Sequence, residues 1–233
     1  AGPAVLSGVQ LAPIEAEMGI IQARQVEQAI RPDDEHQPQT KLVCLENTHN
    51  RAGGVIYPLE VMKEIREVAD RQALRVHLDG ARIFNASVAS GIDVKEYCRL
   101  CDSVMFCLSK GLGAPIGSML VGDSDFIKLA RRYRKLLGGG MRQVGVLAAA
   151  GIYALQNNIE RLHEDHARAR RLAEELANIS GLSIDMNTVQ TNIVVIDIEL
   201  SGLSVEEAIM LLEREGVLVV PFGRTRILSL IHI

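Results

Sequence analysis

The chain has 233 residues, of which 48% are hydrophobic and 3% aromatic, so it can bury a sizeable core of Ala, Val, Ile and Leu. The formal net charge of -4 is spread without long runs of either sign, which argues against a nucleic-acid-binding stripe and favours a small-molecule partner. No apolar run reaches the roughly 18 residues of a membrane span, and AGPAVLSGVQ lacks the basic segment of a signal peptide, so we expect a cytoplasmic protein with no membrane partner.

The first half of the chain alternates between short apolar runs and helical patterns. We predict strands at 4–11, 41–47, 74–79, 103–109 and 117–122, and helices at 14–30, 58–72 and 94–100. This rhythm is typical of an α/β fold, in which helices cover a mostly parallel sheet through right-handed crossovers.

The second half indicates a smaller unit. A helical tract without Pro runs from Met141 to about Ile179, and its composition becomes charge-rich near Asn157. We therefore predict a large domain at 1–157 and a small α+β domain at 158–233.

Within the small domain, NIVVIDI, VLVV and RILSLI are predicted strands. SVEEAIMLLEREG is a predicted amphipathic helix, capped by Ser204 and ended by Gly216. The chain opens on a predicted strand and stops at SLIHI inside another, so we expect a fragment of a longer protein.

The cysteines and two histidines are expected to have structural roles. The four cysteines lie in apolar or helical surroundings, which is typical of reduced, buried side chains: Cys44, Cys98, Cys101 and Cys107. Cys98 and Cys101 form a C-x-x-C, but no second ligand pair follows at zinc spacing, so packing is favoured over a metal or redox site. His163 and His166 lie on the charged helix ERLHEDHARARR, where a solvated face is expected.

Charged residues follow two of the predicted strands at the points where the strands end. Asp79 and Arg82 follow LRVHL, and Lys110 comes shortly after VMFCL. Ligands of open α/β sheets bind outside the carboxyl ends of the strands. If the two strands lie near each other, a carboxylate, an amine and a guanidinium face the same crevice.

Pyridoxal phosphate is a cofactor that fits this set. It needs a lysine for a Schiff base and a carboxylate that keeps its pyridine nitrogen protonated. Lys110 and Asp79 match these roles. From spacing alone, a surface ion pair at two loop starts explains the charges equally well.

Four longer segments carry a family resemblance. LENTHN (45–50), HLDGARIFNA (77–86), CLSKGLGAPIGSMLVG (107–122) and GGGMRQVGVLAAAGIYAL (138–155) resemble, in this order, the low-specificity L-threonine aldolases. These belong to the β-eliminating lyase branch of fold type I pyridoxal phosphate enzymes. The resemblance implies the aspartate aminotransferase fold, a large cofactor-binding domain with a smaller C-terminal one, and a homotetramer whose sites are shared between subunits.

The resemblance also implies roles for single residues. Lys110 would form the Schiff base, Asp79 would pair with the pyridine nitrogen, and Arg82 would lie by the cofactor and the substrate carboxylate. His36 occupies a loop position where the family has a histidine close to the substrate hydroxyl, reaching toward a neighbouring subunit's site. Without the resemblance, a lone histidine in a loop is more often interpreted as a solvated side chain.

Further positions have both a functional and a structural reading. Asn47 and His49 follow a strand and could approach the cofactor ring, although such residues also serve as turn and cap residues. Gly138 to Gly140 and Arg142 precede a predicted helix, where free N–H groups and a guanidinium would suit a phosphate. A helix-start turn alone would explain the glycines.

The sequence departs from the family pattern at both ends. The family's Ser-Gly-Thr phosphate loop, ring-stacking histidine and N-terminal substrate segment would all precede residue 1. If His232 is aligned with the family's Thr-His pair, the arginine slot for the substrate carboxylate holds Leu228. Arg226 is the candidate substitute, displaced by two strand rises of roughly 3.3 Å each. We expect that residues 228–233 are not the native continuation.

The sequence thus predicts a pyridoxal phosphate-dependent aldolase that cleaves L-threonine or L-allo-threonine to glycine and acetaldehyde, with His36 as the candidate base. Two alternatives stay open. One is a related fold type I lyase or aminotransferase, which would share Lys110 and Asp79. The other is a fragment without catalytic activity.

Overall fold

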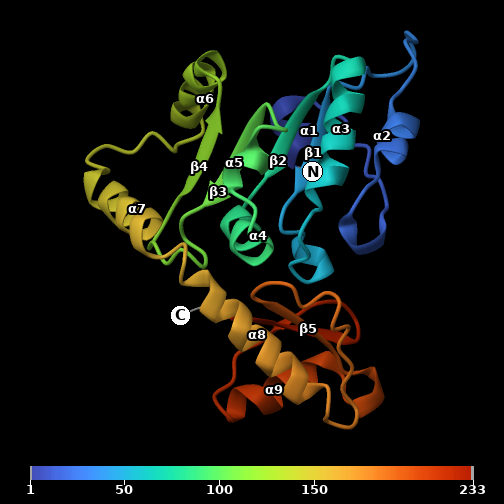
Figure 1. The fold of residues 1–233 in the computed structure, drawn as a ribbon, viewed down its shortest axis with the longest axis vertical. Coiled ribbons are helices and arrows are strands. Elements are labelled where there is room, and N and C mark those ends of the chain that lie inside the picture. Colours follow the sequence, from blue (N-terminus) through green and yellow to red (C-terminus); the bar gives the residue numbers. More distant parts are fainter. Residues whose placement is uncertain (1, 232–233) are drawn as a thin grey trace.

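The computed structural model describes residues 2–231, so His232 lies outside the described residues. Two sheets form two lobes, and helix α8 (Leu162–Leu176) leads from the large lobe to the small one (Figure 1). Among residues 2–231, no helix combines the length and the apolar character needed to cross a membrane.

The sheet of the large lobe has the strand order β1-β2-β3-β4. Strands β1 (Leu42–Glu46), β2 (Arg75–Asp79) and β3 (Ser103–Cys107) are parallel, as predicted. Strand β4 (Ser118–Gly122) runs antiparallel to β3, because residues 108–117 form a tight loop that is too short for a parallel crossover. All residues of β4 are exposed.

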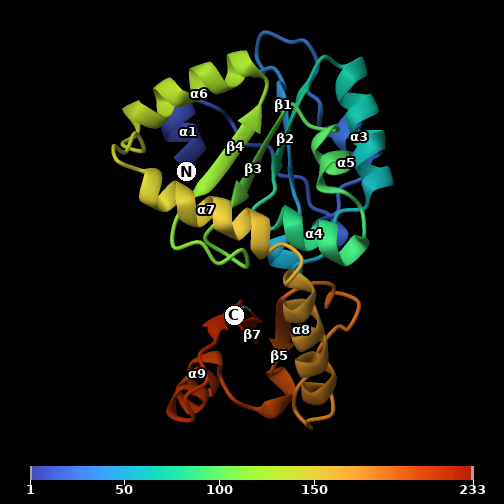
Figure 2. The ribbon, with the colours of Figure 1, turned by 60° about the vertical axis from the view of Figure 1, so that its left-hand side comes forward.

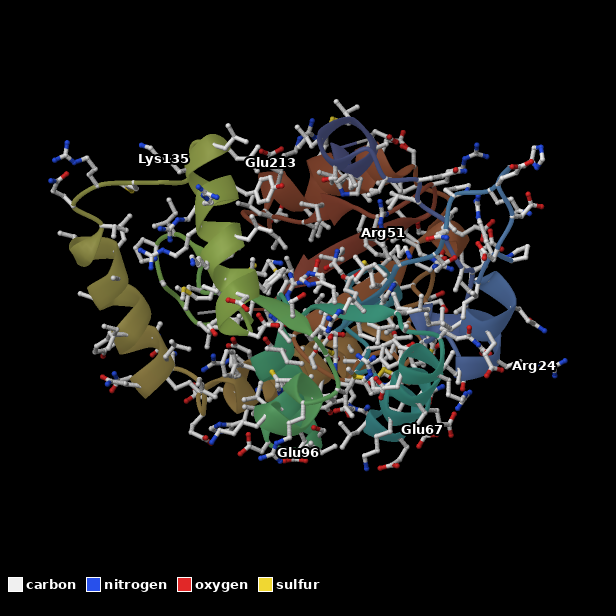
Figure 3. All side chains as sticks on the ribbon, turned by 90° about the horizontal axis from the view of Figure 1, so that it is seen from above. Arg24, Arg51, Glu67, Glu96, Lys135 and Glu213 are labelled. Atoms are coloured by element: carbon white, nitrogen blue, oxygen red, sulfur yellow. The ribbon has the colours of Figure 1, made fainter. Side chains whose placement is uncertain are left out.

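Helices on one face of this sheet supply a large part of its core. In α3 (Leu59–Arg71), apolar residues recur every three or four positions, so Met62, Ile65 and Val68 pack together against the strands. Helices α4 (Ile83–Ser90) and α5 (Val94–Cys98) add to the same cluster. Figure 2 shows α3 and α5 on one side of the sheet, and Figure 3 shows Glu67 and Glu96 of these helices pointing outward.

The N-terminal strand prediction is wrong. Residues 2–7 form the exposed helix α1 (Gly2–Ser7), in which Pro3 fits the first turn and Gly8, with a φ of 62°, ends the helix. The helix predicted at 14–30 is shorter, because Gly19, with a φ of 73°, ends the 3-10 turn η1 (Glu17–Gly19) before α2 (Ala23–Ala29) begins.

The predicted tract from Met141 to Ile179 consists of separate helices. Helix α7 (Gly145–Asn157) and α8 are joined by residues 158–161, so the predicted composition change at Asn157 falls at a real break. Helix α6 (Ser124–Leu136), which the sequence analysis did not predict, begins at a cap in which Asp123 accepts a hydrogen bond from Phe126 N at 2.8 Å. The domain boundary at 157/158 stays a prediction.

The small lobe contains a three-stranded antiparallel sheet of order β5-β7-β6. Its strands are β5 (Ile193–Asp197), β6 (Val220–Pro221) and β7 (Arg226–Leu230), and η3 (Glu199–Ser201) follows β5. Helix α9 (Val205–Arg214) has the predicted Ser204 cap, completed by Glu207 as a capping box. The lobes are tied by Thr191 Oγ1, which donates to the Gly54 carbonyl at 2.8 Å in a buried contact.

Two side chains expected to be structural lie in surroundings that differ from the prediction. Cys44 is exposed, because alternate residues of β1 face α3 and Cys44 points to the opposite, open side. His166 is half-buried in the contact between α4 and α8 rather than solvated, whereas His163 is exposed as predicted. Cys98, Cys101 and Cys107 are half-buried, and burial raises the pKa of Cys101 to about 12.

Candidate active site

The two charged strand ends lie at one edge of the sheet. Strands β2 and β3 are neighbours, Asp79 is paired in register with Met105, and Lys110 follows β3 in the loop 108–117. The carboxyl ends of β1, β2 and β3 point toward the small lobe (Figure 1). The expectation that these strands lie side by side is therefore confirmed, and both Asp79 and Lys110 are exposed there.

Backbone contacts to both neighbouring strands fix the position of Asp79. Asn47 N donates to the Asp79 carbonyl at 2.9 Å, and Gly80 N donates to the Met105 carbonyl at 2.8 Å. The Asp79 side chain accepts a hydrogen bond from Ala81 N at 3.0 Å, which holds the carboxylate over the start of the next turn.

Asn47 is buried beside Asp79 and has one unused donor. Its Oδ1 accepts from Tyr57 N at 3.1 Å, while its Nδ2 finds no partner among residues 2–231. Tyr57 is held in turn by its hydroxyl, which donates to the Ile21 carbonyl at 2.7 Å, and burial raises the pKa of that hydroxyl. An unpaired buried donor costs roughly 1–3 kcal/mol, so Asn47 Nδ2 is poised for an acceptor.

Arg82 brings a positive charge into the same region with only 9% of its surface exposed. Its Nη1 donates to Asn50 Oδ1 at 3.0 Å, and its Nε has no partner within the described part of the chain. Burial lowers the pKa of Arg82, while the nearby Cys107 and Glu46 act in the opposite direction. The guanidinium is thus held on one side and has a free donor on the other.

Asn50 is a residue that the sequence analysis missed, although it ends the LENTHN segment. It begins the 3-10 turn η2 (Asn50–Ala52), and its N–H donates to Glu46 Oε1 at 2.9 Å. Because Glu46 ends β1, this contact aligns Asn50 with the strand that neighbours Asp79.

His49 acts as a cap residue, which is one of the two roles predicted for it. Its Nδ1 accepts a hydrogen bond from Ala52 N at 3.2 Å and so caps η2. A Cβ on Gly19 would lie 2.4 Å from the imidazole, which shows that the η1 turn packs directly onto this ring. His49 lines two clefts of about 790 Å³ each. One of these clefts runs along the open face of β1 and is also lined by Asp79, whereas Lys110 lines neither cleft.

The loop that carries Lys110 is closed by its own backbone. Gly113 N donates to the Lys110 carbonyl at 2.8 Å, Ala114 N donates to the Leu108 carbonyl at 3.0 Å, and Leu108 N donates to the Gly117 carbonyl at 2.9 Å. The side chains of Leu108 and Leu112 are buried, whereas Lys110 is exposed between them. The loop therefore presents the lysine while its leucines anchor it.

Two predicted site residues are not brought to the strand ends of this chain. His36 precedes β1 and so lies toward the amino end of that strand, where its Nδ1 is 3.0 Å from Asp34 Oδ1 and 80% of its side chain is exposed. Arg142 is exposed in the connection between α6 and α7, which Figure 2 shows at the side of the large lobe. Their roles stay predictions.

Arg226 lies at the start of β7 and already has an acidic partner. Its Nε donates to Asp197 Oδ2 at 3.1 Å across the register pair with β5. A backbone hydrogen bond from Glu199 and this contact with Arg226 lower the pKa of Asp197. Of the two clefts that His49 lines, Arg226 lines the one without Asp79, and Arg51 lines it too. The guanidinium of Arg51, which Figure 3 labels, lies 5.5 Å from the Phe222 ring centroid.

Comparisons of this chain with known proteins find relatives with similar sequences. The model of the family described as "Beta-eliminating lyase" matches residues 1–199. Low-specificity L-threonine aldolase 1 of Arabidopsis thaliana is 42% identical over 99% of this chain and 66% of its own length. The low specificity L-threonine aldolase of Escherichia coli is 54% identical over 75% of this chain and 52% of its own. The chain thus spans less than two thirds of these relatives.

Solved structures confirm the predicted fold. A threonine aldolase from Leishmania major superposes with a TM-score of 0.79 at 18% identity, over 99% of this chain and 67% of the other. The α/β architecture is that of fold type I, which pyridoxal phosphate-dependent aminotransferases share. With the family match over most of its length, this chain belongs to the beta-eliminating lyase family.

Proposed function

We propose that the chain forms most of a pyridoxal phosphate-dependent aldolase that cleaves L-threonine and L-allo-threonine to glycine and acetaldehyde. One observation carries the proposal: Asp79 ends β2 and Lys110 follows the neighbouring parallel strand β3, at one sheet edge and beside a buried guanidinium. The names of the relatives, which are L-threonine aldolases, support L-threonine as a substrate.

The residues present fit this cofactor. Two buried donors at the strand ends, Asn47 Nδ2 and Arg82 Nε, lack partners within residues 2–231 and would suit an anionic, oxygen-rich ligand. Lys110 would hold the cofactor by condensing its amine with the aldehyde, with loss of water, and Asp79 would accept a hydrogen bond from the pyridine nitrogen. When bound, pyridoxal phosphate supplies a ring that draws electrons from the substrate α-carbon.

The side chains then have separate tasks. Arg82 binds the substrate carboxylate through its free Nε–H and so fixes the bond to be broken relative to the ring. The Asp79 carboxylate keeps the pyridine nitrogen protonated. His36 of a neighbouring subunit accepts the proton of the β-hydroxyl, and Arg142 binds phosphate. Arg226 contributes to carboxylate binding by exchanging Asp197 for the substrate.

The proposal extends to an assembly and a compartment. We propose a homotetramer in the cytoplasm, in which His36 completes a site of an adjacent subunit. Its place before β1, away from the strand ends of its own chain, leaves it free to reach another subunit and supports this proposal. The reaction would supply glycine by consuming threonine.

The test is covalent trapping on the 233-residue chain. Pyridoxal phosphate is added, borohydride reduces any Schiff base, and the modified peptide is mapped by mass. We expect modification at Lys110, with none in Lys110→Ala. Scattered labelling, against a full-length relative as positive control, would reject the cofactor site. Formation of acetaldehyde and glycine, rather than pyruvate or a keto acid, separates the aldolase from a related lyase or aminotransferase.

A further inference from the structure

We propose that Asn158 is a positioning residue, which sets the direction of the Lys110 side chain through the turn that follows it. The inference rests on the proposed function, since it concerns the lysine that would hold the cofactor. Asn158 comes from the junction of α7 and α8, far from Lys110 in the sequence.

The contact runs through a single peptide unit. Asn158 Nδ2 donates to the Leu112 carbonyl at 2.7 Å. The N–H of that same peptide unit belongs to Gly113 and donates to the Lys110 carbonyl at 2.8 Å. Because a peptide unit is planar and rigid, holding its oxygen also fixes the direction of its N–H. The Asn158 amide is thereby coupled to the backbone of Lys110.

The surroundings leave this turn little room to move. Leu112 is buried in a cluster with Leu108, Ala154 and Leu162. A Cβ on Gly111 would lie 2.8 Å from Leu162 Cδ2, so the backbone next to Lys110 already touches α8. Gly113 has a φ of 76°, a conformation that favours glycine. Asn158 thus adds a side-chain hydrogen bond to a turn that backbone hydrogen bonds and packing also hold.

Such a hydrogen bond matters for a reacting amine. The lysine nitrogen must form a bond to the aldehyde carbon while the aldehyde oxygen leaves as water, and misplacement by about 1 Å can slow a reaction roughly 100-fold. Loss of a hydrogen bond that sets the orientation is therefore expected to slow condensation at Lys110. A purely structural role would alter only the stability.

Asn157 offers a matched control. It is exposed, and its Nδ2 donates to the Tyr153 carbonyl at 2.8 Å within α7 rather than to the lysine loop. N158D and N157D both keep the shape of the side chain and add a negative charge, but only N158D removes the donor to Leu112. N158A and N157A form a second pair, which removes the donor without adding a charge.

The experiment measures the rate of Lys110 modification by pyridoxal phosphate, as a function of pH, together with the melting temperature of each variant. We expect N158D and N158A to slow the modification about tenfold and to shift its pH profile, while the Asn157 variants match the wild type. Equal rates in both pairs, with wild-type Lys110 labelled, would overturn this inference and leave the proposed function intact. Absence of labelling in the wild type would overturn both.

Discussion

Asn50 is the acceptor that holds the buried Arg82 guanidinium, so we expect its replacement to lower the stability of the fold. Asn50→Ala removes the partner of Nη1 and leaves a second donor of Arg82 unpaired, which should lower the free energy of unfolding by roughly 1–3 kcal/mol. Urea unfolding measures the change. Asn187→Ala, at an exposed position, is the control, and a loss no larger than in that control would contradict the role of Asn50.

Asp79 is the carboxylate whose charge the proposed chemistry uses. Asp79→Asn keeps the shape and the contacts of the backbone but removes the negative charge, so some cofactor should still bind. We expect the rate of threonine cleavage to fall roughly 10- to 100-fold, because a charge-assisted hydrogen bond is lost. Steady-state kinetics measure this, with Asp33→Asn in the loop before β1 as the control. A rate equal to the wild type would remove Asp79 from the mechanism.

At the scale of elements, α4 and α8 meet through a hydrogen bond that depends on pH. Asn85 Nδ2 lies 3.1 Å from His166 Nε2, and burial, with a smaller effect of His163, lowers the pKa of His166 to about 4. The unfolded chain should titrate near the ordinary value of about 6.5. Between these values the unfolded state binds a proton that the folded state does not, so stability falls as the pH is lowered.

The corresponding variant is His166→Gln, which keeps an acceptor for Asn85 and cannot titrate. We expect the fall in melting temperature between pH 6.5 and pH 4 to be smaller than in the wild type, as measured by thermal unfolding across that range. His163→Gln, on the exposed side of the same helix, should reduce the slope less than His166→Gln, because it removes only the smaller of the two effects on the pKa of His166. Identical slopes for both variants would show that His166 does not contribute.

The elements that the sequence predicted well are those whose local pattern agrees with their packing. Helix α3 has its apolar stripe at helical spacing, and α9 has both a cap and a glycine stop. The direction of β4 was not predicted, since it depends on the path of the loop 108–117 rather than on the strand's residues. Burial of His166 depends on the approach of α4, which leaves no trace in the charged pattern of α8.

The site residues also divide into those with a local sequence pattern and those that depend on distant contacts. Asp79 and Lys110 could be placed from the sequence because strand ends are local features and parallel neighbours bring them to one edge. Asn158 could not, because its partner Leu112 is 46 residues away and no pattern marks a side chain that bonds a distant carbonyl. Asn50 lay within a segment that was singled out, but its contact with Arg82 requires the η2 turn.

At the scale of the whole molecule, cofactor binding should stabilise the fold. A ligand at 100 times its dissociation constant adds about 2.7 kcal/mol, which corresponds to a rise in melting temperature of roughly 5–10 °C for a chain of this size. Thermal unfolding with pyridoxal phosphate tests this, and pyridoxine phosphate, which lacks the aldehyde, should give a smaller shift. No shift over a wide concentration range would indicate an inactive fragment.

The Thr191 contact that ties the lobes has a consequence for the order of folding. It joins residues 137 positions apart, so it can form only after a long loop has closed and both sheets have taken shape. Docking of the lobes should therefore follow the main barrier. We expect Thr191→Val to speed unfolding while leaving the refolding rate nearly unchanged, as stopped-flow chevron measurements would show. Slower refolding would place this contact in the folding nucleus instead.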